Sequence, residues 1–165
     1  MNKKVLVWLE DRQDYNQEIE AILKESPFEL NICQDLNDFK KTLDSKKTNP
    51  ETIAGFVMDI LIPVDDLTEL GLSTVKTSLG NDTGVQVLKY YLRNALNDSP
   101  MDNIWKKHDV LVLTTLSESY IKSNYKSFMT WEKENNHNTS WLVKADEEGI
   151  RDTCLKATSK WLKRL

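Results

Sequence analysis

The chain has 165 residues, of which 39% are hydrophobic and 29% are charged, and its formal net charge at pH 7 is −4. These values are typical of a soluble globular protein that can bury a core, and they exclude a disordered tail. The Lys and Arg residues are dispersed in an acidic chain, so there is no basic footprint for nucleic acid. We expect a single domain over residues 1–165 that binds neither nucleic acid nor a membrane.

The N-terminal stretch begins like a signal peptide, but its apolar run at residues 5–9 is too short and stops at acidic side chains. We therefore predict a strand there, in a cytoplasmic protein. Cys33 and Cys154 have neither a metal-binding nor a redox spacing, which indicates reduced core residues. His108 and His137 are isolated and receive no role.

Short apolar runs alternate with segments of helical period along the whole chain. Strands are predicted at residues 5–9, 29–33, 53–59, 109–115 and 140–146. Helices are predicted from a capping residue, Asp14, to residue 26, and over residues 36–43, 83–96, 117–129 and 150–162. Residues 44–52 and 130–140 are polar and are predicted to be surface loops.

This alternation predicts a doubly wound α/β fold, in which five parallel strands carry helices on both faces. Such sheets form their sites at the carboxyl ends of the strands, where the strand order reverses. Polar side chains stand at four of these ends, namely Glu10 and Asp11, Asp59, Thr114 and Thr115, and Lys144.

Three carboxylates at one sheet edge repel one another, so a hard divalent cation is their natural partner. Mg²⁺ fits, because it takes one or two carboxylates and keeps water or phosphate oxygens at its other positions. A Lys ammonium and a Thr hydroxyl aimed at the same point would stabilise a phosphoryl group on one carboxylate. Asp59 is the predicted nucleophile.

The order and spacing of these residues resemble the receiver domain of the two-component response regulators. The resemblance covers nearly the whole chain and is carried by the acidic pair Glu10 and Asp11, by Asp59 in the sequence DILIP, by Thr114, and by Lys144 in the sequence WLVK. It implies a flavodoxin-like (CheY-like) fold with the sheet order 2-1-3-4-5. It also implies a signalling phosphoprotein rather than an enzyme of many turnovers.

Family membership implies that Asp59 accepts a phosphoryl group from the phosphohistidine of a histidine kinase or a phosphotransfer protein. It further implies Mg²⁺ as the cofactor, bound by Glu10 or Asp11, by Asp59 and by the backbone carbonyl of Leu61.

The resemblance also assigns the response to phosphorylation. Thr114 and Lys144 would hold the phosphoryl group, and Trp141 would move inward together with the Thr. The face formed by the fourth helix, fifth strand and fifth helix, residues 120–165, would then contact a downstream protein or a second copy of the chain. Because the chain ends after that helix, we expect a stand-alone receiver.

Several residues depart from the family pattern. Ala145 follows the Lys where the family has a Pro after a cis peptide, and a cis bond to a non-proline residue costs about 3 kcal/mol. This puts the direction of Lys144 in question. Thr115 is bulkier than the usual small residue. Leu61 and Leu116 stand at positions that influence the hydrolytic water, and neither side chain can orient it, so we expect slow dephosphorylation.

The largest departure is an insertion at residues 64–83, between Pro63 and Gly84. It contains several leucines, which is too apolar for a disordered tether, and it would lie beside the site as a lid or a docking surface. Asp65 and Asp66 within it are better explained as turn formers than as metal ligands.

Each residue also has a structural explanation of its own, since acids cap helices, Thr favours strands and Lys is common on surfaces. Two other functions follow from this. The first is a pseudo-receiver, an interaction module that is never phosphorylated, which the missing Pro and the insertion favour. The second is a phosphohydrolase of the haloacid-dehalogenase type, which Leu61 opposes because those enzymes have a second Asp at that position.

Overall fold

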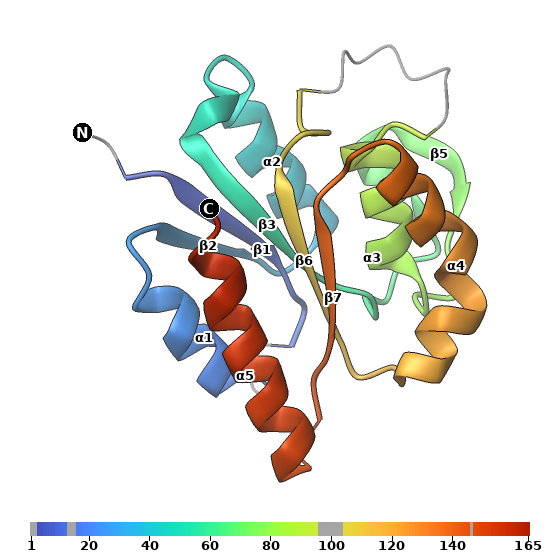
Figure 1. The fold of residues 1–165 in the computed structure, drawn as a ribbon. Coiled ribbons are helices and arrows are strands. Elements are labelled where there is room, and N and C mark those ends of the chain that lie inside the picture. The colour runs from blue at the N-terminus through green and yellow to red at the C-terminus, as the bar shows by residue number, and fades with distance from the viewer. Residues whose placement is uncertain (1–2, 13–15, 96–103, 146) are drawn as a thin grey trace.

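Residues 3–12, 16–95, 104–145 and 147–165 are described in the computed structural model (Figure 1). Their main sheet has five parallel strands in the order β2-β1-β3-β6-β7. These strands are β1 (Val5–Leu9), β2 (Glu29–Cys33), β3 (Ile53–Asp59), β6 (Asp109–Thr114) and β7 (Thr139–Val143). The helices are α1 (Gln17–Lys24), α2 (Leu36–Lys46), α3 (Thr83–Gln86), which continues as a π-helix over Val87–Leu92, α4 (Glu118–Glu134) and α5 (Glu148–Leu162).

Helices cover both faces of this sheet, with α1 and α5 on one side and α2, α3 and α4 on the other (Figure 1). The continuous apolar run of β1 follows from this arrangement, because alternate side chains of a strand point to opposite faces. Leu6 and Trp8 pack toward α1 and α5, while Val5, Val7 and Leu9 pack toward the other helices. The predicted fold class and sheet order are confirmed.

The insertion folds into a small hairpin of β4 (Asp66–Leu67) and β5 (Leu72–Lys76), joined by a 3₁₀ turn over Thr68–Leu70. Leu67, Leu70 and Val75 are buried in the core on the α2 and α3 side. The carboxylate of Asp66 accepts hydrogen bonds from the ammonium of Lys76 at 2.7 Å and from the backbone N–H of Thr68 at 2.9 Å. These three side chains therefore enlarge the core, whereas Leu79 of the insertion is 83% exposed, and Asp66 stabilises the hairpin.

Some predicted boundaries are wrong. The second helix runs on to Lys46, and the predicted loop at 130–140 is largely the last turn of α4 and the start of β7. The described part of α1 begins after Asn16, and the predicted cap Asp14 lies outside the described residues. The strands β6 and β7 end at Thr114 and Val143, one and three residues earlier than predicted.

A buried ion pair explains why α4 is longer than its polar sequence indicates. The side chains of Arg93 and Glu132 are 0% and 4% exposed, with Arg93 Nε 3.2 Å from Glu132 Oε1. The other guanidinium N–H groups of Arg93 donate to the backbone carbonyls of Lys106, His108 and Asn138 and to the hydroxyl of Thr139. One side chain thus joins the end of the π-helix to the starts of β6 and β7. Among the described helices, none is both long and apolar enough to cross a membrane.

Replacing the buried cation should destabilise the fold strongly. We expect Arg93→Met to lower the free energy of unfolding by about 3 to 5 kcal/mol, because the Glu132 carboxylate then stays buried without its counter-charge. The matched control is Arg151→Met, since Arg151 and Glu18 form a pair whose side chains are 45% and 60% exposed. That variant should lose less than about 1 kcal/mol in the same urea titration. Equal losses in the two variants would contradict a structural role for the buried pair.

Candidate functional site

Three carboxylates converge at the carboxyl edge of the sheet. Strands β1 and β3 are hydrogen-bonded neighbours, so the residues that follow β1 lie beside the last residue of β3. One carboxylate oxygen from each of Glu10, Asp11 and Asp59 lies within 4.8 Å of the others. They open into a pocket of about 470 Å³, the acidic pocket, which is lined by Glu10, Asp11, Arg12, Asp59, Leu61, Pro63, Leu79, Gly80, Asn81, Thr115 and Lys144.

Lys144 reaches into this cluster from the end of β7. Its ammonium lies 2.9 Å from Glu10 Oε2 and 2.9 Å from Asp59 Oδ2, and the side chain is 10% exposed. The backbone N–H of Lys144 donates to the carbonyl of Thr114 at 2.7 Å, which extends the pairing of β6 with β7 to this residue. No cis peptide bond occurs among the described residues, the bond to Ala145 included. Lys144 therefore points at Asp59 without the Pro that usually follows it in receivers.

Glu10 is fully buried and is held by three donors. Its Oε1 accepts from the backbone N–H of Arg12 at 3.0 Å, and its Oε2 accepts from Asn16 Nδ2 at 2.7 Å and from Lys144. Burial raises the pKa of Glu10, and the nearby Asp59 charge adds to this, against the lowering effect of Lys144. Asn16 was not among the predicted site residues. Its side chain fixes the direction of the Glu10 carboxylate, a contact that no sequence motif indicated.

Asp11 is the least satisfied of the three acids. Its Oδ1 is buried and has no hydrogen-bond partner, while Oδ2 lies 3.9 Å from the largely exposed guanidinium of Arg12. Burial raises the pKa of Asp11, and the charge of Asp59 raises it further. A buried acceptor without a donor is costly. The Asp11 carboxylate thus has an oxygen available for a cation.

The charges of the pocket fit a divalent cation. Glu10, Asp11 and Asp59 face one buried ammonium, that of Lys144, so the ionised cluster has two negative charges in excess. Carboxylate oxygens are the ligands that Mg²⁺ prefers, and the unpartnered Asp11 oxygen lies among them. The donor set, its charge and its unmet acceptor thus fit a divalent cation such as Mg²⁺.

Asp59 is positioned by its own turn and by a glycine that follows the insertion. Its Oδ1 accepts from the backbone N–H groups of Ile60 at 2.6 Å and of Leu61 at 3.4 Å, and the side chain is 8% exposed. Gly84 donates its N–H to the carbonyl of Ile60, and a Cβ there would lie 1.8 Å from the carbonyl oxygen of Asp59. Only glycine lets the start of α3 approach the strand end this closely.

The two predicted switch residues, Thr114 and Trp141, do not line the acidic pocket. Thr114 is fully buried, and its hydroxyl accepts from the backbone N–H of Leu116 at 3.1 Å. Thr115, the next residue, is the one that lines the acidic pocket. Trp141 is partly buried and stacks on Tyr125 of α4, with 5.9 Å between ring centroids and 24° between the ring planes. In this arrangement the phosphoryl-holding role predicted for Thr114 requires its hydroxyl to turn toward the pocket.

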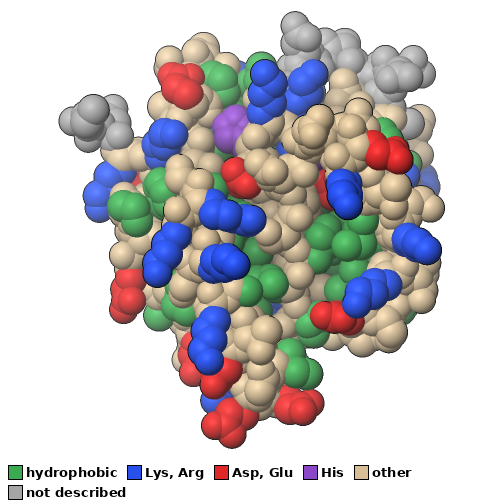
Figure 2. Space-filling model, in the orientation of Figure 1, with side chains coloured by type: hydrophobic (Ala, Val, Ile, Leu, Met, Phe, Trp, Pro, Cys, Tyr) green, Lys and Arg blue, Asp and Glu red, His purple; other side chains and the backbone are tan. Residues whose placement is uncertain are grey.

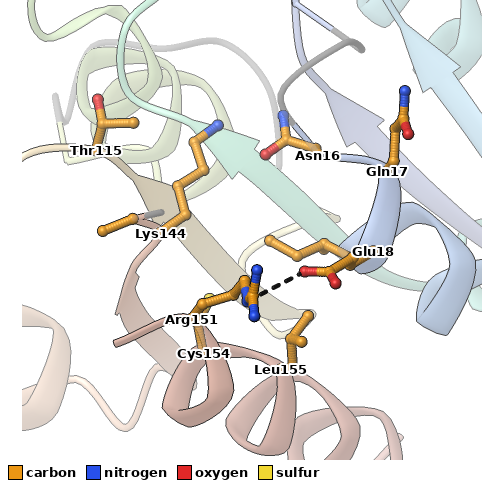
Figure 3. A pocket seen from close by; sticks show the side chains of 10 residues that line it. Asn16, Gln17, Glu18, Thr115, Lys144, Arg151, Cys154 and Leu155 are labelled. Atoms are coloured by element: carbon orange, nitrogen blue, oxygen red, sulfur yellow. Dashed lines mark ion pairs between the residues drawn. The ribbon is translucent and has the colours of Figure 1, made fainter. Parts of the chain in front are cut away.

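A second pocket, of about 380 Å³, lies between the starts of α1 and α5 (Figure 3). Thr115 and Lys144 line both pockets, so they form the boundary between them. On its far side, Arg151 pairs with Glu18 at 3.6 Å, and Asn16 closes the end nearest Glu10. The site therefore opens in two directions from Lys144.

Several solved structures are similar to this chain in fold. The chemotaxis response regulator CheY4 of Vibrio cholerae matches with a TM-score of 0.53 and 16% sequence identity, over 95% of this chain and 99% of that one. The Francisella response regulator 1452 receiver domain matches with a TM-score of 0.53 and 17% identity, over 99% of this chain and 98% of that one. The chain has the fold of a response-regulator receiver domain.

The bacteriophytochrome response regulator AtBRR also matches, with a TM-score of 0.53 and 14% identity, over 94% of this chain and 92% of that one. No protein-family model matches the sequence, and no curated protein matches it either. The similarity to receiver domains is thus a similarity of fold.

The raised pKa of Asp11 implies that the ionised Asp11 carboxylate lowers the free energy of unfolding. A carboxyl whose folded pKa lies above its unfolded value supports folding below the unfolded pKa, and this contribution is lost as the pH rises through the folded pKa. We expect Asp11→Asn in metal-free buffer to be about 1 kcal/mol more stable than the wild type at pH 7. The gain should vanish below the ordinary Asp pKa of 3.8.

Urea titrations at both pH values measure this difference. The control is Asp65→Asn, because Asp65 is exposed and lies outside the acidic pocket. It should change the stability little at either pH. A wild-type protein that is more stable than Asp11→Asn at pH 7 without metal would show that the Asp11 charge is already compensated.

Proposed function

We propose that this protein is a response-regulator receiver that accepts a phosphoryl group on Asp59 from the phosphohistidine of a histidine kinase or a phosphotransfer protein. The observation that supports it most is the position of Lys144, whose ammonium contacts both Asp59 and Glu10 at 2.9 Å, with Asp11 beside them. Such donors act in the cytoplasm, and we place the protein there.

In the proposed reaction, a carboxylate oxygen of Asp59 attacks the phosphorus of the donor. A bond forms between that oxygen and phosphorus, the phosphorus–nitrogen bond of the phosphohistidine breaks, and the imidazole leaves with the bonding electron pair. The Lys144 ammonium, which already contacts Asp59 Oδ2, neutralises charge on the phosphoryl oxygens. The hydroxyl of Thr115 or Thr114 donates to the same oxygens.

The residues that would hold Mg²⁺ are Asp11, Asp59 and the backbone carbonyl of Leu61. Glu10 lies behind them, because donors from Arg12, Asn16 and Lys144 already occupy its oxygens. When bound, the ion neutralises phosphoryl charge and orients the phosphoryl group for transfer.

Signalling would use the surface of α4, β7 and α5. Strand β7 is an edge strand of the sheet, and hydrophobic side chains gather between β7 and α4 while Lys and Arg side chains lie over α5 (Figure 2). Met129, Trp141 and Val143 are partly buried hydrophobic residues of this region. A downstream protein or a second copy of the chain would cover these residues. Its binding would depend on whether Trp141 stays stacked on Tyr125.

The first test is phosphorylation in the absence of a kinase. Wild-type protein incubated with Mg²⁺ and acetyl phosphate should gain the mass of one phosphoryl group, and Asp59→Asn should not, because an amide cannot form the acyl phosphate. The control is Asp66→Asn, whose carboxylate pairs with Lys76 in the hairpin. It should still be labelled. Intact-mass spectrometry measures all three, and equal labelling of the wild type and Asp59→Asn would reject the proposed acceptor.

The pseudo-receiver alternative is favoured by Ala145 and by the hairpin insertion, and beryllofluoride distinguishes it. This ion mimics a phosphoryl group on an aspartate, so with Mg²⁺ it should raise the melting temperature of a true receiver. In Asp59→Asn the melting temperature should stay unchanged. A wild-type protein that does not respond, yet is folded, would support the pseudo-receiver.

A third expectation concerns the lifetime of the phosphorylated protein. Leu61 lines the acidic pocket, and Leu116, which follows the pocket residue Thr115, is partly buried; neither side chain has a polar group to orient a water molecule. After the phosphodonor is removed, the wild type should lose its phosphoryl group over minutes or longer. Leu61→Asn should shorten this lifetime about tenfold or more. Decay of the wild type within seconds, followed by intact mass, would contradict this explanation.

A further inference from the structure

The end of the insertion separates the acidic pocket from a second hollow of the molecule. We call this stretch, residues 78–82, the wall segment. Its other side faces a groove of about 310 Å³ between α3 and α4, whose lining includes Gln86, Asn124, Tyr125 and Phe128. Asn81 lines both the acidic pocket and the groove. The two cavities therefore share a wall that belongs to the insertion.

On the pocket side, the wall segment is bonded to the backbone that follows Asp59. The N–H of Ile62 donates to the carbonyl of Gly80 at 3.1 Å, and the hydroxyl of Thr83 donates to the carbonyl of Ile62 at 2.7 Å. A Cβ at Gly80 would lie 2.7 Å from the Ile62 carbonyl oxygen, so the two backbones are in direct contact. The backbone after Asp59 is therefore in direct contact with the wall segment.

On the groove side, the carboxylate of Asp82 holds the segment to α3. Its Oδ1 accepts from the backbone N–H of Ser78 at 2.7 Å, which closes the segment on itself. Its Oδ2 accepts from Gln86 Nε2 at 2.6 Å, which ties the segment to the helix. Across the groove lies Tyr125, which also stacks on Trp141. The groove thus touches both the wall segment and the predicted switch residue.

We propose that the wall segment relays occupancy of the acidic pocket to the groove between α3 and α4, so that the shape of the groove reports whether Asp59 carries a phosphoryl group. The proposal rests on the proposed function, since it requires a ligand in the acidic pocket. A tightly bonded segment between two cavities transmits a shift because it moves as one unit. Position between two sites is not itself coupling, so the coupling must be measured.

The measurement uses a fluorophore in the groove. Asn124→Cys is labelled with a polarity-sensitive dye, and both native cysteines are buried, at 1% and 3% exposure. The probe ligand is Mg²⁺ with beryllofluoride, and its binding is followed independently through the melting temperature. The reference label is Lys41→Cys on α2, an exposed position outside the lining of both cavities and outside the α4–β7–α5 surface.

We expect the emission of the groove label to shift over the same beryllofluoride concentrations that raise the melting temperature, while the reference label changes less. Adding Asp82→Ala, which breaks both side-chain anchors and leaves the backbone bond from Gln86 N–H to the Asp82 carbonyl, should reduce the emission shift strongly and keep the melting response. Gln86→Ala, which removes only the anchor to α3, should reduce the shift and serves as the second variant if Asp82→Ala folds poorly.

The outcomes separate the two proposals. A melting response without a groove shift, or a shift of full size in both anchor variants, overturns the relay and leaves the receiver function intact. A folded wild type with neither a melting response nor a groove shift overturns the receiver function, and the relay with it.

Discussion

The contact of the Lys144 ammonium with Glu10 and Asp59 is the interaction on which the rest of the site depends. Unit charges 4.8 Å apart repel by about 3.5 kcal/mol at an effective dielectric constant of 20, and each pair among the three carboxylates contributes such a term. Two attractions at 2.9 Å, each about 6 kcal/mol on the same scale, are together about as large as the three repulsions before desolvation is counted. The buried acidic cluster at this edge of the sheet is therefore tolerated because the Lys144 side chain, which follows β7, contacts Glu10 and Asp59.

Two buried charge clusters among the described residues differ in charge balance, and this difference indicates a structural role for one and a ligand site for the other. At the amino ends of β6 and β7, Arg93 faces the single carboxylate of Glu132 and finds acceptors for all its N–H groups. At the carboxyl ends, one ammonium faces three carboxylates, and an oxygen of Asp11 has no donor. The Arg93–Glu132 pair is balanced in charge, although Glu132 Oε2 is buried without a hydrogen-bond partner, while the cluster at Lys144 has an excess of negative charge that a divalent cation would offset.

The insertion connects this site with the rest of the fold. Its hairpin contributes Leu67, Leu70 and Val75 to the core, so it is held as firmly as the elements around it. Its last residues, bonded to Ile62, form one side of the acidic pocket. The insertion thereby lines both the acidic pocket, which contains Asp59, and the groove between α3 and α4.

The fold and most of the site were predictable because they follow from local patterns. Alternation of apolar runs with helical periods predicts a parallel α/β sheet, and the polar residues that end its strands must share one edge. Glu10, Asp11, Asp59 and Lys144 were found in this way. The predicted loop at 130–140 was wrong because Glu132, a polar residue in sequence, is buried against Arg93, a residue 39 positions earlier.

The sequence by itself determined where each strand ends and which polar residue follows it, and hence which residues form the acidic cluster. Both depend on the side-chain pattern along short segments. Only the tertiary structure decided that Asn16 orients Glu10, that Gly84 admits α3 against Asp59, that Thr115 rather than Thr114 lines the pocket, and that the insertion forms its wall. These features depend on contacts between segments that are distant in the chain. No local sequence pattern specifies which distant residue a side chain will contact.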